Sequence, residues 1–363
     1  MLFVFWTSYR MKQVLKIQQQ VLINSGLSKP IIAINDEEQA MKSNLKLEIG
    51  FIDLSYWVSE HSSFTLNNKP DNKKQILRNV SGQFPTKSLT AIMGPSGSGK
   101  TTLLKLLAGQ ITTGEYKGSR ILNGQDLNPK DYLRIMNSQG YVAQQDYFLE
   151  TLTVWQTLCY AALLRIRDDV SIAEKITRAA KVMYEMGLES AANTVLSNDS
   201  NNSDSSKGIS GGQRRRLSIA QALLGNPQAI LLDEPTSGLD ASTSMQLVKC
   251  LNKMTKELHT TIAITIHQPR SEVFALFDNL ILLGSGGYLV YSGSNQQAAQ
   301  YLDSMPIVNL SLTSYDNPGD FIMDVLDKSN YCKNISKNNK VVDRTSSSNN
   351  NVNNTYDVVS YIR

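Results

Sequence analysis

The sequence predicts an α/β fold with a buried core sheet. Three apolar runs, residues 88–93, 229–232 and 261–266, each have the length and character of a buried strand. Each run is followed by a polar motif, and the first motif leads into residues 101–108, which suit a helix. Because ligands of open α/β sheets bind at the carboxyl ends of the strands, the residues after these runs are candidate binding residues.

The first motif is a complete phosphate-binding loop. Residues 94–101 satisfy the pattern G-x-x-x-x-G-K-[ST] without deviation. Glycines let backbone N–H groups approach phosphate oxygens closely, and the helix that follows adds the partial positive charge of its N-terminus. Lys100 is expected to neutralise the β- and γ-phosphates, and the Thr101 hydroxyl is placed to bind Mg²⁺. The predicted nucleotide-binding residues of this segment are Gly94, Pro95, Ser96, Gly97, Ser98, Gly99, Lys100, Thr101 and Thr102.

The second motif is an acidic pair at the end of the apolar run 229–232. Asp233 is expected to hold Mg²⁺, directly or through water, and Glu234 to activate the attacking water as a general base. The alternative is a strand that ends in a solvated acidic turn, an arrangement that is common by itself. The motif Pro-Thr-Ser-Gly-Leu-Asp at residues 235–240 argues against that alternative.

Two further motifs complete a pattern that resembles the nucleotide-binding domain of ATP-binding-cassette (ABC) transporters. Residues 209–213 read Ile-Ser-Gly-Gly-Gln, which is similar to the signature of that family with Ile in place of the usual Leu. His267 follows the apolar run 261–266 and resembles the switch histidine of the family. The phosphate loop, the signature, the acidic strand end and the histidine occur in the order that the family has.

The resemblance implies a P-loop NTPase with a RecA-like core sheet, an antiparallel β subdomain and an α-helical signature subdomain. It also implies that two such domains enclose ATP, with the phosphate loop of one domain facing the signature of the other. His267 would contact the γ-phosphate, and Asp240 would lie in the loop that crosses the dimer interface. The signature residues implied to contact the nucleotide are Ser210, Gly211, Gly212 and Gln213.

Two assignments that rest on the resemblance leave an alternative open. Aligning Tyr-Val-x-Gln assigns Gln144 to contact with Mg²⁺ and the attacking water, and Gln145 is the alternative. Tyr56 is the best candidate for the aromatic residue that stacks on adenine in the family. A packed strand residue is the alternative for Tyr56, because the polar segment 61–74 makes the distance to the phosphate loop longer than in many relatives.

Three features resemble the G subfamily of half-transporters, in which the ATPase domain precedes the transmembrane domain. They are His-Gln-Pro at 267–269, a hairpin pattern over 282–293, and Asn-Pro-Gly-Asp-Phe at 317–321, where Gly replaces the usual Ala. The resemblance covers roughly residues 47–328 and implies ATP hydrolysis that powers export of a lipophilic substrate. A soluble, non-transport ABC ATPase is the alternative, although such proteins usually carry two cassettes or a long coiled coil.

The composition fits one ATPase domain with polar flanking segments. The balance of 36 basic and 32 acidic residues gives a net charge of +4, too small to indicate nucleic-acid binding. The three cysteines lack the spacing of a metal site or a disulfide framework and fit a reducing, cytosolic setting. We expect a lead segment over 1–46, the nucleotide-binding domain over 47–328, and an Asn/Ser-rich linker or tail over 329–363.

The helical subdomain is expected at about 145–225, with helical periodicity over 153–164 and 171–186 and a disordered loop over 197–206. No stretch of the chain approaches the ~20 apolar residues that span a bilayer. The resemblance implies a second nucleotide-binding domain, identical or different, as one partner. Because this chain has no such apolar stretch, the transmembrane domain that the resemblance also implies is expected outside this chain. These partners would hold the chain at the cytoplasmic face of a membrane.

Overall fold

The computed structural model describes residues 46–59, 73–111, 113–197, 208–304 and 310–327. The predicted lead segment 1–46 lies outside the described residues except for Lys46, and the predicted tail 329–363 lies wholly outside them. The predicted loop 197–206 lies outside them except for Ser197. The described chain forms two compact units, one within residues 147–226 and a larger one from the remaining segments.

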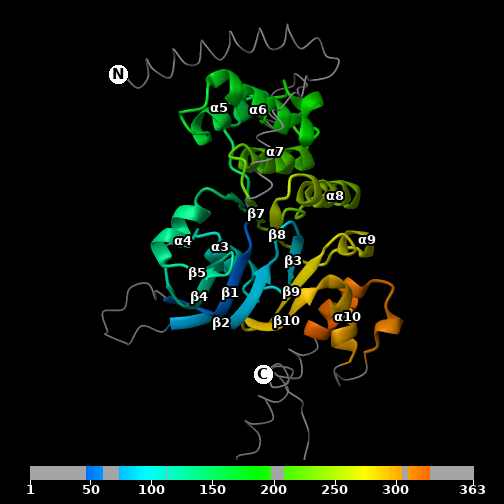
Figure 1. Ribbon diagram of the computed structural model, residues 1–363. Helices are drawn as coiled ribbons and strands as arrows, with labels where there is room; N and C mark the ends of the chain where they lie inside the picture. The colour runs from blue at the N-terminus through cyan, green and yellow to red at the C-terminus, as the bar shows by residue number, and fades with distance from the viewer. Residues whose placement is uncertain (1–45, 60–72, 112, 198–207, 305–309, 328–363) are drawn as a thin grey trace, which may run out of the picture. The chain divides into compact units, whose positions relative to one another are not determined.

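The larger unit is built on a ten-stranded sheet with the order β5-β4-β1-β2-β10-β9-β3-β8-β7-β6 (Figure 1). Strands β1, β2, β4 and β5 pair in antiparallel fashion, whereas β9, β3, β8, β7 and β6 are parallel neighbours. This mixed sheet with its helices confirms the predicted α/β fold. The strands are β1 (Ile49–Ser59), β2 (Lys73–Phe84), β3 (Leu89–Met93), β4 (Glu115–Leu122), β5 (Gln125–Asp126), β6 (Gly140–Val142), β7 (Ala229–Leu232), β8 (Thr261–Thr265), β9 (Asn279–Gly284) and β10 (Tyr288–Ser294).

The three predicted core strands are β3, β7 and β8, and all their residues are buried. Continuous burial is typical of parallel strands that are covered on both faces. The register pairs Ile92 with Thr265 and Leu232 with Ile264, so the carboxyl ends of the three strands meet at one edge of the sheet. The hairpin predicted over 282–293 is also present, because β9 and β10 pair in antiparallel fashion.

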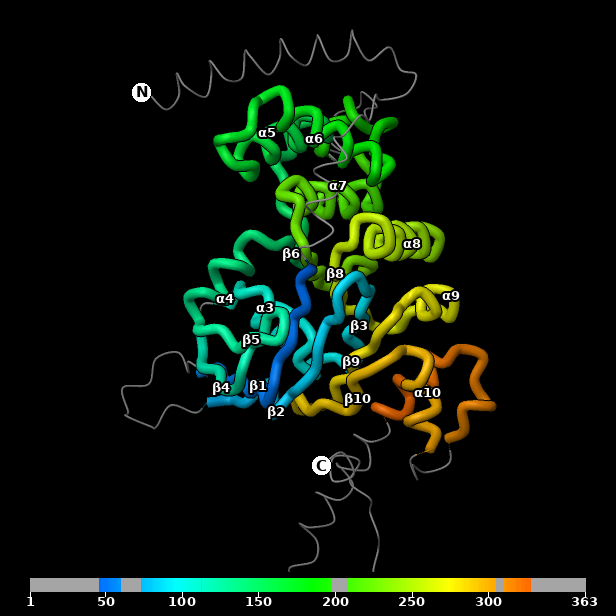
Figure 2. Tube along the Cα trace, viewed as in Figure 1, coloured from blue at the N-terminus to red at the C-terminus, as the bar shows by residue number. Residues whose placement is uncertain are grey.

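The helices of the larger unit follow from local signals in the sequence. Helix α3 begins directly after the phosphate loop (Figure 2), and α8 begins after Asp240, whose carboxylate accepts the backbone N–H of Thr243. Helix α4 has Asn128 as its N-cap and Pro129 at its first position, both favoured at helix starts. The labelled helices are α3 (Lys100–Leu107), α4 (Pro129–Met136), α8 (Ala241–Glu257), α9 (Ser271–Phe274), α10 (Asn295–Asp303) and the 3₁₀ turn η2 (Leu312–Ser314), and residues 318–327 are helical as well.

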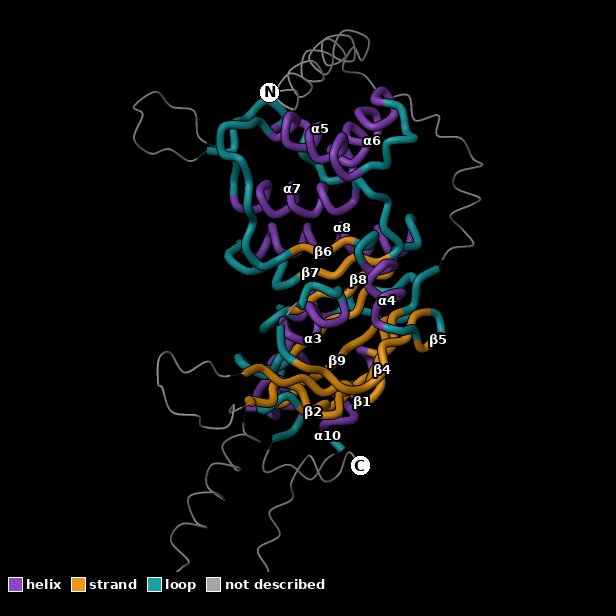
Figure 3. Tube along the Cα trace, turned by 90° about the vertical axis from the view of Figure 1, so that its left-hand side faces the viewer, coloured by secondary structure: helices purple, strands orange, loops and turns teal. Residues whose placement is uncertain are grey.

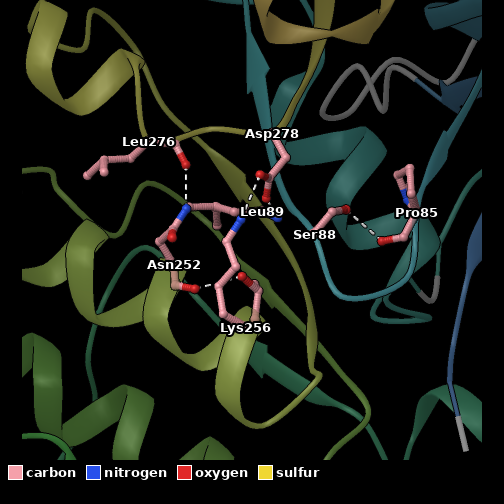
Figure 4. A network of polar contacts seen from close by, with 8 residues as sticks. Pro85, Ser88, Leu89, Asn252, Lys256, Leu276 and Asp278 are labelled. Carbon is pink, nitrogen blue, oxygen red and sulfur yellow. Dashed lines mark hydrogen bonds and ion pairs between the residues drawn. The ribbon is translucent and has the colours of Figure 1, made fainter.

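A polar network fixes α8 to the sheet (Figure 4). Asp278 accepts the backbone N–H of Leu89 at 2.9 Å and the ammonium of Lys256 at 3.1 Å. One turn earlier on α8, the side-chain amide of Asn252 donates to the carbonyl of Leu276 at 2.6 Å. The network connects α8 to β3 and to the segment before β9. It thereby supports β3, the strand that leads into the phosphate loop.

The smaller unit is helical (Figure 3). It contains α5 (Val154–Arg165), α6 (Ile172–Glu185), η1 (Glu189–Ala191) and α7 (Gly211–Leu223). Helices α5 and α6 confirm the helical periodicity predicted over 153–164 and 171–186. Among the residues that the structure describes in both units, no helix is long and apolar enough to cross a bilayer.

Candidate functional site

The phosphate loop connects β3 to α3 and depends on glycine at two positions for different reasons. A Cβ atom at Gly94 would lie 2.2 Å from the carbonyl oxygen of Leu283, so only glycine fits against β9 there. Gly97 has a positive φ of 77°, and a Cβ atom built on it would meet nothing within 4 Å. The backbone around Gly97 is therefore open to an approaching anion.

Lys100 is folded into the loop that precedes it. Its side chain is 6% exposed, and its ammonium donates to the carbonyls of Gly94 at 2.8 Å and Pro95 at 3.0 Å. Burial lowers the pKa of this amine, while the nearby carboxylates of Glu234 and Asp233 oppose the decrease. A buried cation beside an open loop fits a phosphate group.

The remaining loop residues also fit an anionic ligand. The Ser98 hydroxyl is fully buried and has no hydrogen-bond partner among the described residues, so a bound group could supply one. Ser96 is exposed, and Thr102 is half-buried in the first turn of α3.

The first acidic residue of the pair, Asp233, meets the phosphate-loop helix. Asp233 is 1% exposed and lies directly after β7. Its Oδ1 accepts the hydroxyl of Thr101 at 2.9 Å and the hydroxyl of Thr265 at 2.8 Å. A hydroxyl and a carboxylate side by side are oxygen donors of the kind that Mg²⁺ prefers. The two predicted Mg²⁺-binding residues of the phosphate loop and acidic pair are thus brought together.

Sequence reasoning missed Thr265. It occupies the last position of β8, where its side chain is fully buried, and it reads in the sequence as part of an apolar run. The sequence did contain one signal for this role. Thr265 is a polar residue at the carboxyl end of a predicted core strand, two positions before His267.

The second acidic residue, Glu234, adopts an uncommon backbone conformation with a φ of 44°. Its backbone N–H donates to Thr265 Oγ1 at 2.7 Å, and its Oε2 accepts the side-chain amide of Gln144 at 2.8 Å. The predicted general base and the predicted glutamine therefore contact each other directly, although 90 residues separate them.

His267 is exposed at the end of β8. It lines the same hollow as Glu234 and Ser237, so the acidic pair after β7 and the histidine after β8 open onto one hollow. Asp240 is the exposed N-cap of α8, and hydrogen bonds from Ser242 and Thr243 hold the pKa of its carboxyl well below its usual range.

Tyr56 does not fit the assignment made from the sequence. Its side chain is 4% exposed in the core of the antiparallel strands, and its hydroxyl donates to the carbonyl of Thr113 at 2.6 Å. A ring enclosed in this way offers no face to an adenine. The stacking assignment was therefore wrong, and the packed strand residue is what the structure has.

The signature segment forms the start of α7 in the smaller unit. Ser210 Oγ accepts the backbone N–H of Gln213 at 3.2 Å, and Gln213 Oε1 accepts the backbone N–H of Ser210 at 2.8 Å. This reciprocal pair is a capping box, which fixes the helix N-terminus. Gly211 is exposed and Gly212 is buried, so the backbone at Ser210 and Gly211 can be approached from outside the unit.

Two protein families match this chain. The family described as ABC transporter matches residues 77–237, and the family described as ABC-2 type transporter matches residues 267–359. ABC transporter G family member 1 of Dictyostelium discoideum is 40% identical over 281 residues, covering 77% of this chain and 34% of the relative. ABC transporter G family member 22 of Arabidopsis thaliana is 40% identical over 257 residues, covering 70% of this chain and 32% of the relative. The chain thus spans about a third of the length of these curated relatives.

Solved structures show the same fold. A dimeric bacterial ABC transporter cassette is 25% identical with a TM-score of 0.53, covering 68% of this chain and 98% of that one. A component of an ABC transporter complex from Clostridium perfringens is 22% identical with a TM-score of 0.55, covering 73% of this chain and 96% of that one.

Proposed function

Because this chain belongs to the ABC transporter family, we propose that it is the ATP-hydrolysing part of a transporter subunit of the G subfamily. The observation that best supports this proposal is the convergence of Lys100, Asp233 and Glu234 at one edge of the core sheet. A phosphate loop, an acidic pair and a glutamine in mutual contact are the parts that phosphoryl transfer to water requires.

The phosphate loop would bind the triphosphate. The backbone N–H groups of residues 96–102 would donate to phosphate oxygens, and the ammonium of Lys100 would exchange its two carbonyl partners for the β- and γ-phosphates. Thr101, Asp233 and Gln144 would hold Mg²⁺, which when bound neutralises charge on the phosphates. The Thr101–Asp233 contact keeps two of these oxygen ligands adjacent before any ligand arrives.

Glu234 would act as the general base. It would accept a proton from water while the water oxygen attacks the γ-phosphorus, and the bond from that phosphorus to the bridging oxygen would break to leave ADP and phosphate. His267 would donate a hydrogen bond to the γ-phosphate and help position the water. The Gln144 amide already restrains the Glu234 carboxylate at 2.8 Å, so that carboxylate is oriented by a second side chain.

A second nucleotide-binding domain, identical or different, would complete each site. The partner copy's signature segment, residues 210–213, would cap the γ-phosphate, and Asp240 would lie across the interface. The capping box of α7 supports this role, because it presents a helix N-terminus and an exposed glycine to an anion. The two domains would close when ATP binds and reopen after hydrolysis. This motion would couple the ATPase cycle to transport.

Transport would be the output of this cycle. The match of residues 267–359 to the ABC-2 type transporter family supports a transmembrane part in the complete transporter, with the ATPase at the cytoplasmic face of a membrane. The G subfamily resemblance favours export of a lipophilic substrate, and it disfavours a soluble, non-transport ATPase.

The replacement Glu234→Gln tests the proposed chemistry. It removes the base but keeps the side-chain size, so turnover of ATP by the purified 363-residue chain is expected to fall by about 100-fold or more. ATP affinity, measured by calorimetry, is expected to stay within about threefold, because the phosphate loop is unchanged. Glu257→Gln is the matched control, since Glu257 is an exposed carboxylate on α8 that pairs only weakly with Lys253 at 3.7 Å. Equal turnover in the Glu234→Gln and Glu257→Gln variants would refute the assignment of Glu234.

A further inference from the structure

The hydroxyl of Thr265 joins the two acidic residues of the site. It donates to Asp233 Oδ1 at 2.8 Å and accepts the backbone N–H of Glu234 at 2.7 Å. The side chain is fully buried at the carboxyl end of β8. A hydroxyl carries one proton and two lone pairs, so this single group can serve both neighbours at once.

The contact with Glu234 supports a strained backbone. The φ of 44° at Glu234 lies in the left-handed region, which is unfavourable for a residue with a side chain and persists only where the surroundings impose it. The Glu234 N–H is anchored by Thr265, and the Glu234 carbonyl accepts the N–H of Ser237 at 3.1 Å. Because the backbone sets the direction of the Cα–Cβ bond, this turn determines where the Glu234 carboxylate can point.

The contact with Asp233 restrains the other carboxylate. Two hydroxyls converge on Oδ1, one from Thr101 on α3 and one from Thr265 on β8. Both hydrogen bonds are protected from competing water by the burial of Asp233. The orientation of this carboxylate is thereby set by two different elements.

We propose that Thr265 is a positioning residue for hydrolysis, whose hydroxyl holds the Asp233 carboxylate and the Glu234 turn in one arrangement. The inference rests on the proposed ATPase function, because it assigns Thr265 to the same site. Thr265 acts through its two acidic neighbours, and the phosphate loop supplies the main contacts to the nucleotide. Loss of the hydroxyl is therefore expected to lower kcat much more than ATP affinity.

The same strand offers a matched control. Thr261 lies at the opposite end of β8 and is 1% exposed. Its hydroxyl donates to the carbonyl of Leu47 at 2.7 Å and accepts the N–H of Lys87 at 3.3 Å. Thr261→Val and Thr265→Val each remove a buried hydroxyl of the same strand without a change in side-chain shape, but only the second change touches the acidic pair.

The first experiment compares ATP turnover and ATP affinity in the Thr265→Val, Thr265→Ser and Thr261→Val variants of the 363-residue chain. Thr265→Val is expected to reduce kcat about 10- to 100-fold, since small displacements of reacting groups have effects of that order, while the Kd for ATP changes less than about threefold. Thr265→Ser keeps the hydroxyl and is expected to restore most of the kcat, and Thr261→Val to retain it. Equal kcat in Thr265→Val and Thr261→Val, or an equal loss in Thr265→Ser and Thr265→Val, would overturn the proposal. If Thr265→Val does not fold, Thr265→Ala provides the same comparison.

The second experiment does not depend on turnover. Hydrogen exchange of the Glu234 amide, followed by NMR, is expected to be about tenfold faster in Thr265→Val than in Thr261→Val, because one protecting hydrogen bond is lost. Unchanged protection of this amide would contradict the role of Thr265. A parent chain without ATP turnover would overturn the proposed function itself, whereas an active parent with identical Thr265→Val and Thr261→Val variants would overturn only the role of Thr265.

Discussion

Removing the Tyr132 hydroxyl is expected to destabilise the larger unit at the far end of the phosphate-loop helix. Tyr132 lies on α4, is fully buried, and donates to the carbonyl of Leu107 at 2.7 Å. That carbonyl belongs to the last turn of α3, where backbone acceptors have no partner within the helix. The ordinary pKa of a tyrosine hydroxyl already lies well above neutral pH, and burial raises the pKa of Tyr132 further, so the hydroxyl is a donor under ordinary assay conditions.

The magnitude follows from the atoms that Tyr132→Phe changes. A net hydrogen bond contributes about 0.5–1.5 kcal/mol, and a buried carbonyl left without a donor raises the cost to about 1–3 kcal/mol. We therefore expect the free energy of unfolding to fall by about 1–3 kcal/mol. The ring itself is retained, so the contact of the Arg120 guanidinium, 4.2 Å from the Tyr132 ring centroid, is not lost.

The assay is urea unfolding of the parent and variant chains, followed by far-UV circular dichroism. Tyr315→Phe is the control, because the Tyr315 hydroxyl donates to Asp324 at the surface and its removal is expected to cost less than about 0.5 kcal/mol. If Tyr132→Phe and Tyr315→Phe unfold at the same urea concentration, the hydrogen bond from α4 does not stabilise the end of α3. The reasoning from burial would then be refuted.

Two further predictions concern the phosphate loop and the cysteines. Gly94→Ala is expected to weaken ATP binding at least about tenfold by calorimetry, because the new Cβ meets the Leu283 carbonyl. Gly124→Ala is the control, because a Cβ there meets no atom within 4 Å at a φ of 78°, and this variant should bind ATP as the parent does. Equal affinity in the two variants would contradict the close packing inferred at Gly94. Burial raises the pKa of the Cys159 thiol to about 12, so iodoacetamide at pH 8 is expected to label the partly exposed Cys250 and to spare Cys159 until urea is added, as measured by peptide mass spectrometry. Labelling of Cys159 in the folded chain at the rate of Cys250 would show that α5 opens readily.

The parts of the site that the sequence predicted are those encoded in one continuous segment. The phosphate loop needs only its own glycines and the helix that follows, and the acidic pair needs only the apolar run before it. For the same reason the core strands β3, β7 and β8 were predicted, since continuous burial leaves an apolar run in the sequence.

The contacts between these segments were decided by tertiary structure. Strand order and register bring Thr101 and Asp233 within 2.9 Å across 132 residues, and they place Gln144 against Glu234 across 90. Neither contact can be predicted from the local pattern of polar and apolar residues. Register also makes Thr265 part of the site, because its partners come from another strand end and not from its own neighbours in the sequence.

Tyr56 is the converse case, because the sequence suggested a place in the site and the tertiary structure buries the side chain in the core. Its position in a strand before the phosphate loop suggested contact with adenine, but an aromatic residue on a strand can face either solvent or core. The pairing of β1 with both β2 and β4 decides that its ring is enclosed. The sequence by itself therefore determined which chemical groups this protein has for binding a nucleotide. Only the tertiary structure decided which of them meet, because contacts between distant segments depend on strand order and register and not on local periodicity.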